Sequence, residues 1–267
     1  MIGKKHFVVL SSAGIALGAC VACAGVAIAD ENTAADAGSG GHTQSTEVYS
    51  GTDFAKDAQG YFAGATMAFN GDLARSGPIL KIGGGISNYE YASDSVVGGI
   101  VDGDGYVAGV LVGYHLALGH VDASLAVGAD YHDEQLSPDD PTAVVNGTEV
   151  GFIASGDLAF SGSNLSLSLA GIYSTAFDSY WSRARFGYDS DCFAIGPEAL
   201  AFGVDGYDAR RLGGFATIKF NLTPSTEAEL TLSVGHQFVA QGSTGGDVGG
   251  TGGGEGTYVT IGTGLSF

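Results

Sequence analysis

Polar and apolar residues alternate along most of the chain, a pattern typical of β-strands whose two faces meet different surroundings. Over 226–239, for example, Leu230 and Leu232 fall on one face, while Thr231 and Ser233 fall on the other. The pattern predicts twelve strands, at 47–56, 59–70, 78–91, 104–117, 119–132, 147–161, 164–176, 179–188, 192–204, 207–221, 226–239 and 257–267. Merging hairpins at the start or around 176–192 gives ten strands as the alternative.

The connections between the predicted strands differ in length in an orderly way. One set of turns is compact, and the other set contains the three longest loops, 92–103, 133–146 and 240–256. Outer-membrane barrels combine an even strand count with short periplasmic turns, longer external loops and both termini inside. We therefore expect an all-β fold, an antiparallel up-and-down transmembrane β-barrel over residues 47–267. A soluble sandwich shows the same alternation, but the two ends of the chain favour the barrel.

The last strand ends the chain on an aromatic residue. Phe267 shares one face with Leu265, Ile261 and Val259. This arrangement resembles the final strand of Gram-negative outer-membrane barrels, where the terminal aromatic serves as an assembly signal. We therefore expect Phe267 to be recognised by barrel assembly machinery, and outer-membrane lipid to surround the strands.

The first residues resemble a secretory signal peptide. Lys4 and Lys5 precede a long apolar stretch, and Ala27-Ile28-Ala29 fits the cleavage rule of small residues around a variable one. We expect a signal peptide at 1–29 and a flexible periplasmic leader at 30–46. An uncleaved anchor and lipidation at Cys20 are the alternatives. With the signal cleaved, we expect the chain to be exported from the cytoplasm and its barrel to lie in the bacterial outer membrane.

Composition limits the possible partners. Removal of the signal leaves 8 basic against 29 acidic residues, a net charge of −21, which argues against binding nucleic acid. The 46 glycines argue against long helices, since each costs roughly 1 kcal/mol relative to alanine. Cys192 is the one cysteine of the mature chain, so no disulfide framework is expected.

Five charged residues fall in three consecutive predicted strands, on faces that can point into the lumen. They are Arg183, Arg185, Glu198, Arg211 and Lys219. A charge facing lipid at mid-depth costs about 2–4 kcal/mol, so the lumen is their expected place. The set either braces the barrel through an Arg–Glu network or lines a pore wall as a polar track for carboxylates or sugar hydroxyls.

Pro197 lies within the predicted strand 192–204. Because proline has no backbone N–H, we expect a bulge or a local bend at this point. The bend would re-aim Glu198, which makes Glu198 the first lumen residue to mutate.

Patterns that would indicate catalysis or metal binding are weak. Asp102-Gly103-Asp104-Gly105 resembles part of a calcium loop but lacks the remaining ligands, so we expect a solvated external loop. His132 beside Asp133 is a possible general-base pair, but no nucleophile accompanies it. We expect no enzyme activity, no cofactor and no metal site.

Several stretches resemble the bacterial cellulose biosynthesis protein BcsS family. They are Tyr49–Ala55, Leu136–Pro141, Gly171–Arg185, Gly196–Glu198 and Gly206–Phe215, and the likeness covers about 47–267. The Tyr-Trp-x-Arg-x-Arg and Gly-Pro-Glu motifs are the more specific parts, and Cys192 is a minor departure. The resemblance implies association with cellulose or its secretion machinery, and it carries over no catalytic residues.

The resulting functional expectation is a non-catalytic outer-membrane accessory protein of cellulose biosynthesis or secretion. Two alternatives come from other classes: a general small-solute pore, and a surface structural protein whose acidic loops contact polysaccharide. Conductance would separate the pore from the other two, and polysaccharide binding would identify the third.

Overall fold

The computed structural model describes residues 44–240 and 253–267, and nearly all of them belong to one sheet. Its strands are β1 (Thr46–Ala55), β2 (Ala58–Ala68), β3 (Gly77–Ala92), β4 (Ile100–Leu118), β5 (Val121–Ser137), β6 (Gly147–Ser161), β7 (Leu165–Ser174), β8 (Tyr180–Asp189), β9 (Phe193–Val204), β10 (Tyr207–Thr223), β11 (Thr226–Ala240) and β12 (Gly256–Ser266). A short 3-10 turn, η1 (Ala176–Asp178), lies between β7 and β8. Within the described residues, no helix is long and apolar enough to cross a membrane.

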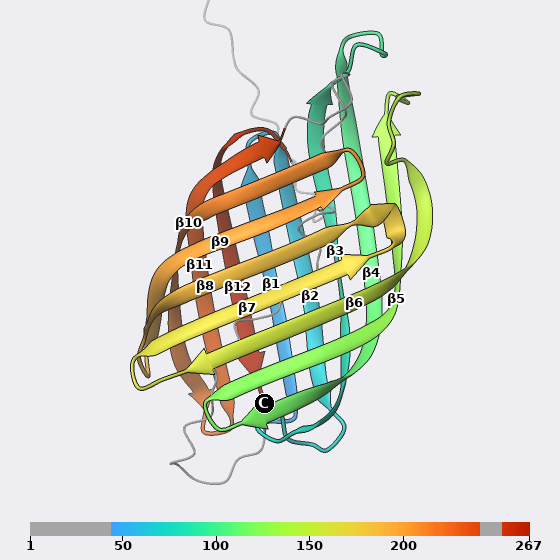
Figure 1. The fold of residues 1–267 in the computed structure, drawn as a ribbon. Helices are drawn as coiled ribbons and strands as arrows, with labels where there is room; N and C mark the ends of the chain where they lie inside the picture. The colour runs from blue at the N-terminus through green and yellow to red at the C-terminus, as the bar shows by residue number, and fades with distance from the viewer. Residues whose placement is uncertain (1–43, 241–252) are drawn as a thin grey trace, which may run out of the picture.

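The sheet closes on itself as a barrel (Figure 1). Each strand pairs antiparallel with its neighbours in sequence, and β12 closes the ring by pairing with β1, from Glu47↔Ser266 to Phe54↔Val259. The prediction of a twelve-stranded antiparallel barrel is therefore confirmed, and the ten-strand alternative is wrong.

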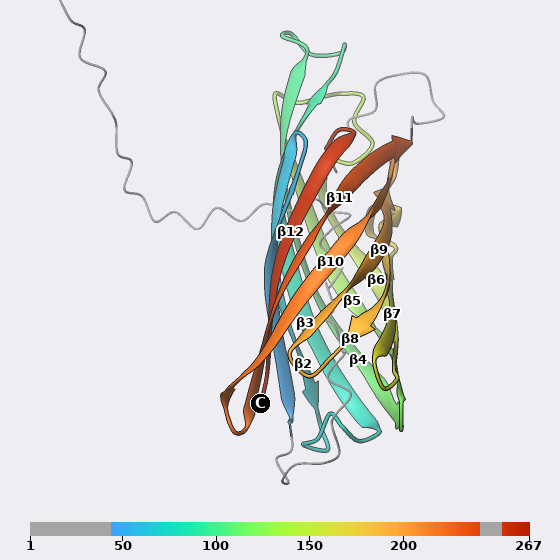
Figure 2. The same ribbon diagram turned by 90° about the vertical axis from the view of Figure 1, so that its left-hand side faces the viewer.

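The two ends of the barrel differ. The end bearing the β3–β4 and β5–β6 loops, called the long-loop end below, also carries the two-residue turns β1–β2 and β9–β10. The predicted loops 92–103 and 133–146 were too long, because β4 and β5 continue as paired strand and leave 93–99 and 138–146. The extended hairpins project beyond the other strands, away from the C-terminus (Figures 1 and 2).

Part of the predicted organisation lies outside the described residues. The signal peptide at 1–29, Cys20 and most of the leader at 30–46 belong to this part, and so does most of the loop predicted at 240–256. The barrel begins at Thr46, where β1 starts.

The outer surface of the barrel is apolar. Leu125 is 74% exposed and Phe152 is 56% exposed, and both point away from the lumen. On β4, the unbroken run of outward apolar residues ends at Tyr106, and toward the long-loop end Asp104 and Asp102 follow before Ile100 at the start of the strand. This marks the edge of an apolar belt, which is the surface that lipid would cover.

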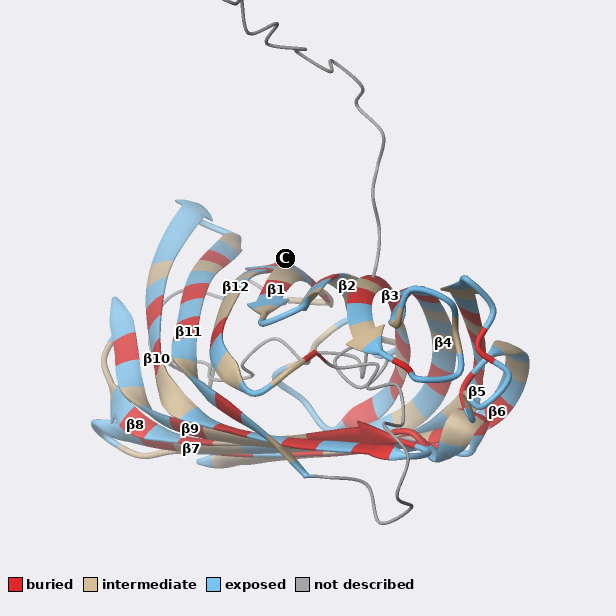
Figure 3. Ribbon diagram, turned by 90° about the horizontal axis from the view of Figure 1, so that it is seen from above, coloured by how far each residue is buried: buried red, intermediate tan, exposed pale blue. Residues whose placement is uncertain are grey.

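The barrel is flattened in cross-section (Figure 3). The wall formed by β12, β1 and β2 faces the wall formed by β7, β8 and β9. Long inward side chains of one wall can therefore contact strands that are not their neighbours in the sheet.

Pro197 does not create a bulge. β9 keeps one register with β8 on both sides of it, from Arg185↔Glu198 to Tyr188↔Ile195, and the pairing is only interrupted in between. The missing N–H costs ladder bonds without adding a residue to the strand. The prediction of a bulge was therefore wrong, and Glu198 points inward through the ordinary alternation.

Candidate functional site

The interior of the barrel is polar and charged. Inward positions on almost every strand carry buried hydroxyl, amide, carboxylate or basic side chains. A buried charge is stable only when it is paired and hydrogen-bonded. The partners of these charges therefore define what the interior can do.

Arg211 on β10 forms a deeply buried ion pair with Asp53 on β1. Its side chain is 1% exposed, and its two terminal nitrogens each donate to one carboxylate oxygen of Asp53 on β1, both at 2.8 Å. Its Nε donates to Gln237 Oε1 at 2.7 Å, and Thr260 Oγ1 donates to Asp53 Oδ1 at 2.5 Å. Because β11 and β12 lie between β10 and β1, the pair joins strands that are not neighbours.

Aromatic rings enclose the Arg211 guanidinium. Its carbon lies 4.9 Å from the ring centroid of Phe202 and 4.6 Å from that of Tyr258. A desolvated cation gains more from a ring face than an exposed one does. Arg211 is therefore held in place from several directions and is not a mobile lining residue.

A second network joins Arg185 on β8 with Glu198 on β9. Arg185 Nε donates to Glu198 Oε2 at 2.5 Å, and a second nitrogen donates to Ser233 Oγ on β11 at 3.1 Å. Tyr258 on β12 donates its hydroxyl to Glu198 Oε1 at 3.2 Å. Since Tyr258 also faces Arg211, the two networks meet and together link β8 through β12 with β1.

The remaining two charged residues of the predicted track lie apart from this centre. Lys219 donates to Asp189 Oδ1 at 2.6 Å, with both side chains partly exposed. Arg183 is half-buried with its guanidinium 5.4 Å from the Trp181 ring centroid. The structure thus brings together Arg185, Glu198 and Arg211.

The sequence analysis missed a second cross-barrel ion pair. Lys81 on β3, 1% exposed, donates its Nζ to Asp157 Oδ2 on β6 at 2.5 Å and to Ser124 Oγ on β5 at 2.9 Å. Asp53 was missed as well. The available signal was their inward position in the alternation, and Asp53 also lies in the Tyr49–Ala55 stretch that resembles the family.

An apolar cluster also crosses the interior. Tyr49 on β1 packs with Leu111 on β4, Ala126 on β5, Ile153 on β6 and Ile172 on β7, and all are buried. We call this group the Tyr49 cluster. Because β1 pairs only with β2 and β12, the cluster is a contact between facing walls.

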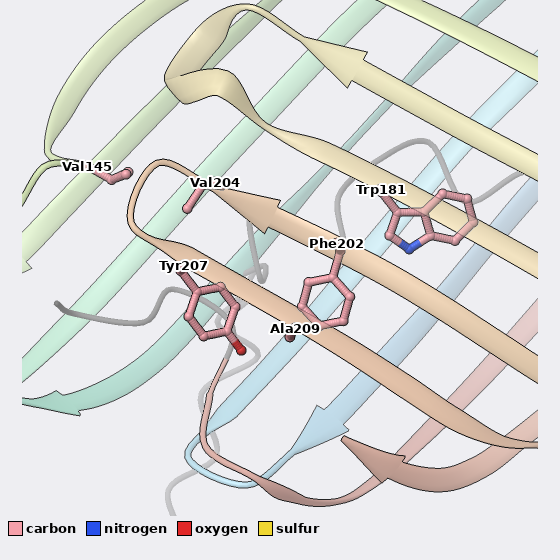
Figure 4. Packing of buried hydrophobic residues seen from close by; sticks show 6 residues of the cluster. All are labelled: Val145, Trp181, Phe202, Val204, Tyr207 and Ala209. Carbon is pink, nitrogen blue, oxygen red and sulfur yellow. The ribbon is translucent and has the colours of Figure 1, made fainter. Parts of the chain in front are cut away.

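A second cluster, called the Trp181 cluster, lies toward the long-loop end. It consists of Val145, Trp181, Phe202, Val204, Tyr207 and Ala209 (Figure 4). Val145 belongs to the β5–β6 loop, whereas the others come from β8, β9 and β10. The loop is thus packed against the inner side of the wall.

Asp140 ties the β5–β6 loop to the β3–β4 loop. Its Oδ1 accepts from Ser95 Oγ at 2.5 Å and from Thr142 N and Oγ1 at 2.9 and 2.7 Å, and its Oδ2 accepts from Tyr91 at 3.1 Å. Burial opposes the charged form, but the hydrogen bonds from Ser95 and Thr142 prevail and hold the pKa of Asp140 well below its usual range. The charged carboxylate therefore clamps the two loops together.

His132 does not pair with Asp133. Its Nε2 lies 2.7 Å from Asp130 Oδ2, whereas Asp133 accepts from Thr148 and Gln135 on the other side of the sheet. Adjacent residues of a strand face opposite ways, so the proposed pair could not form.

The segment Asp102–Gly105 is strand, not a calcium loop. Asp102 and Asp104 point outward, and Asp104 accepts a hydrogen bond from Asn88. Among residues 44–240 and 253–267, no group of three or more His, Cys, Asp or Glu side chains is placed to hold a metal ion.

A closed antiparallel barrel with an apolar outer surface and a polar interior defines the class of transmembrane β-barrels. Residues 48–267 match the model of a protein family described as Cellulose biosynthesis protein BcsS. The chain belongs to that family, which confirms the resemblance noted from its motifs.

Solved outer-membrane proteins are similar to this chain at low sequence identity. An outer membrane channel from Pseudomonas putida F1 is 14% identical with a TM-score of 0.48, and the match covers 87% of this chain and 98% of that one. The KdgM porin in complex with disordered oligogalacturonate is 12% identical with a TM-score of 0.39, covering 83% and 99%. At these values the likeness transfers no function. No curated protein matches the chain.

Proposed function

We propose that this chain is a non-catalytic outer-membrane accessory protein of cellulose biosynthesis, whose barrel is braced shut by its own side chains. Family membership supports the pathway. The apolar belt supports the outer membrane, with the long-loop end outside and Phe267 at the periplasmic rim. In this proposal the barrel anchors or assists the secretion machinery and conducts no solute by itself.

The observation that carries the proposal is the set of contacts between strands that do not pair. Asp53–Arg211, Lys81–Asp157 and the Tyr49 cluster each join separate parts of the wall through buried side chains. An open pore keeps its polar lining hydrated. In contrast, the four charged side chains of these two ion pairs are each 5% exposed or less. The same contacts favour the bracing role of Arg185, Glu198 and Arg211 over a polar track.

Planar-bilayer conductance tests the closed barrel. We expect the purified native protein to give no stable open state, because the facing walls are in contact. Tyr49→Ala removes the aromatic centre of the Tyr49 cluster and should give measurable openings. Phe54→Ala, on the outer face of the same strand, is the matched control and should stay closed. Steady conductance of the native barrel would favour the pore instead.

Cellulose output tests the pathway. A strain lacking the protein should make or export less cellulose, and the native chain should restore the output. Arg211→Met barrels that still reach the outer membrane should restore it too, since bracing matters for folding and not for passage. A loss of output in correctly assembled Arg211→Met barrels would support a path along the polar wall.

The projecting hairpins favour one further candidate, a surface that contacts polysaccharide. On their outward face, Asn88 donates to Asp104, and Asp133 accepts from Thr148 and Gln135. This exposed row of amide and carboxylate groups could contact sugar hydroxyls. Replacing Asn88 and Gln135 by alanine should then weaken the pelleting of the protein with cellulose, and unchanged pelleting would remove the candidate.

A further inference from the structure

The inner face of β5 near the long-loop end carries three titratable side chains in a row. Asp130, His132 and Glu134 occupy alternate positions, and each is 3% exposed or less. His132 and Asp130 share one hydrogen bond, and Tyr89 donates its hydroxyl to Glu134 Oε2 at 3.0 Å. None of the three belongs to the bracing networks described above.

Four polar atoms of this region are buried with no hydrogen-bond partner among residues 44–240 and 253–267. They are Asp130 Oδ1, His132 Nδ1, Glu134 Oε1 and Ser87 Oγ. Buried polar groups nearly always have a partner, so each exception calls for a cause. These four atoms lie on β3 and β5, the two strands that flank β4. Their grouping indicates a site in which a bound ligand supplies the missing partners.

Two glycines leave room beside these atoms. A Cβ added at Gly151 on β6 would lie 2.7 Å from Asp130 Oδ1, and one added at Gly105 on β4 would meet Glu134 Oε1 and Ser87 Oγ. A side chain at either position would therefore displace the unpartnered atoms. Because glycine has no side chain, these two positions leave space on the inner surface next to the unpartnered atoms.

The chemistry of the four atoms favours a neutral ligand rich in hydroxyl groups. Burial raises the pKa of Glu134 to about 8, opposed by the hydrogen bond from Tyr89 and supported by the charges of Asp133 and Asp104, so its surroundings favour the uncharged carboxyl. Asp130 is already paired with His132. Carboxyl, imidazole and hydroxyl groups with little net charge suit sugar hydroxyls, which both donate and accept, better than an ammonium group or a metal ion.

Phe177 of η1 packs against the middle member of this row, His132. Its ring lies edge-on to the His132 ring, with centroids 6.2 Å apart. Phe177 and Asp178 have φ values of 49° and 46°, in the left-handed region that side chains avoid. Such backbone strain clusters in segments that clamp or release ligands. The Phe177 N–H donates to Glu149 Oε2 at 3.0 Å, and this bond would have to break on opening.

We propose that Asp130, His132, Glu134 and Ser87 form a binding site for a neutral hexose oligosaccharide, closed in this structure by Phe177. The inference rests on the proposed function, which brings a glucan to the long-loop end. Binding displaces η1 and places sugar hydroxyls on the four unpartnered atoms. The polysaccharide would bind at this site without passing through the barrel.

The test titrates cellotetraose into the purified barrel and follows the emission of Trp181, the only tryptophan of the chain. Phe177 packs against the Trp181 cluster, so displacement of η1 changes the surroundings of the Trp181 ring. Calorimetry on the same samples detects binding that leaves the emission unchanged. Maltotetraose and the diamine putrescine are the comparison ligands.

The variants are Asp130→Asn, Ser87→Ala and, as the matched control, Asp102→Asn on the exposed outward face. We expect saturable binding of cellotetraose, weakened at least tenfold in the first two and unchanged in the control. Ser87→Ala removes an unpartnered hydroxyl, so it should bind worse while unfolding no more easily than the native protein. This combination separates a ligand contact from a structural role.

Three results would overturn the site: no saturable binding of either oligosaccharide, equal affinity in Ser87→Ala and the native protein, or binding of putrescine alone. Preference for maltotetraose would keep the site and reassign its glycan. If cellotetraose does not bind but a strain lacking the protein makes less cellulose, the site is wrong and the proposed function stands. Unchanged output in that strain would remove the proposed function and leave the binding result to decide the site.

Discussion

At the scale of single residues, the interior is decided by how each buried charge is paired. Arg211 is satisfied by Asp53, Gln237 and two ring faces, so its desolvation is compensated from all sides. Removing one partner of such a pair leaves the other charge buried alone, which costs about 3–5 kcal/mol. We therefore expect stability, and not conduction, to be the property most sensitive to these residues.

Arg211→Met should lower the free energy of unfolding by about 3–5 kcal/mol, because Asp53 loses its counter-charge. Urea unfolding of the barrel in lipid vesicles measures it. Arg210→Met, an exposed position on the same strand, is the control and should change stability by less than about 0.5 kcal/mol. The double variant with Asp53→Asn should recover part of the loss, and a loss as large as in the single variant would contradict the pairing.

Glu134 makes stability depend on pH through a raised pKa. It lies beyond the apolar belt, and burial raises its pKa from the ordinary value to about 8. The folded state therefore holds a proton that the unfolded state releases, and this stability is complete below about pH 4.3 and lost as the pH rises through about 8. Glu134→Gln should match the native protein at pH 5 and exceed it at pH 9 in melting temperature. Equal pH profiles would show that Glu134 is not held neutral.

At the scale of elements, the strands follow local pattern while the loops depend on their neighbours. β4 and β5 continue beyond the predicted ends because each pairs with the other as far as Asp102↔Ser137. The acidic segments look like loops in the sequence, and only their cross-strand partners show that they are strand. The β5–β6 loop is then fixed by Asp140 and Val145 and not by its own composition.

Asp140→Ala should release the β5–β6 loop, because Ser95, Thr142 and Tyr91 lose their common acceptor. Proteinase K should cut within 138–146 roughly tenfold faster than in the native protein, the equivalent of about 1.4 kcal/mol. Asp139→Ala, the exposed neighbour, should be cut at the native rate.

The pH dependence of this clamp has the opposite sign to that of Glu134. Burial acts to raise the pKa of Asp140, but the hydrogen bonds from Ser95 and Thr142 outweigh it and lower the pKa in the folded state. Its contribution is present above the ordinary value of about 3.9 and is lost as the pH falls below it. Pepsin cleavage of the loop should therefore rise as the pH drops under about 4, and no rise would contradict the clamp.

At the scale of the whole molecule, closure of the ring decides what touches what. β12 is held between β11 and β1, and the backbone carbonyl of Phe267 accepts from Ser45 N and Thr46 N at 2.8 and 2.9 Å. Its side chain is 47% exposed and points outward, on the same face as Leu265 and Ile261. This outward position is where an assembly factor could reach it, and the assembly role itself stays a prediction.

Phe267→Ala should reduce the amount of folded barrel in the outer membrane several-fold without changing the stability of the barrels that do fold. The physical reason is that the Phe267 side chain is 47% exposed on the outer face, so its loss should affect recognition during assembly more than the stability of the folded barrel. Heat-modifiable migration of membrane fractions measures the folded amount. Phe69→Ala, another exposed aromatic at the same end, should leave it unchanged; an equal loss would point to general surface damage.

The sequence by itself determined the strands, their faces and the class of barrel. These depend on local rules: side chains alternate along a strand, and turn and loop lengths set the direction of each hairpin. For that reason twelve strands and the face that Phe267 shares with Leu265 and Ile261 could be predicted, and the inward faces of Arg185, Glu198 and Arg211 followed from the same alternation.

Only the tertiary structure decided which inward residues meet. Arg211 and Asp53 are 158 positions apart, and Lys81 and Asp157 are 76 apart. Their contacts depend on the register with which the ring closes and on the flattening of the barrel, and neither leaves a periodic trace in the chain. Alternation states that a side chain points inward, but the distance between facing walls decides whether it lines a pore or closes it.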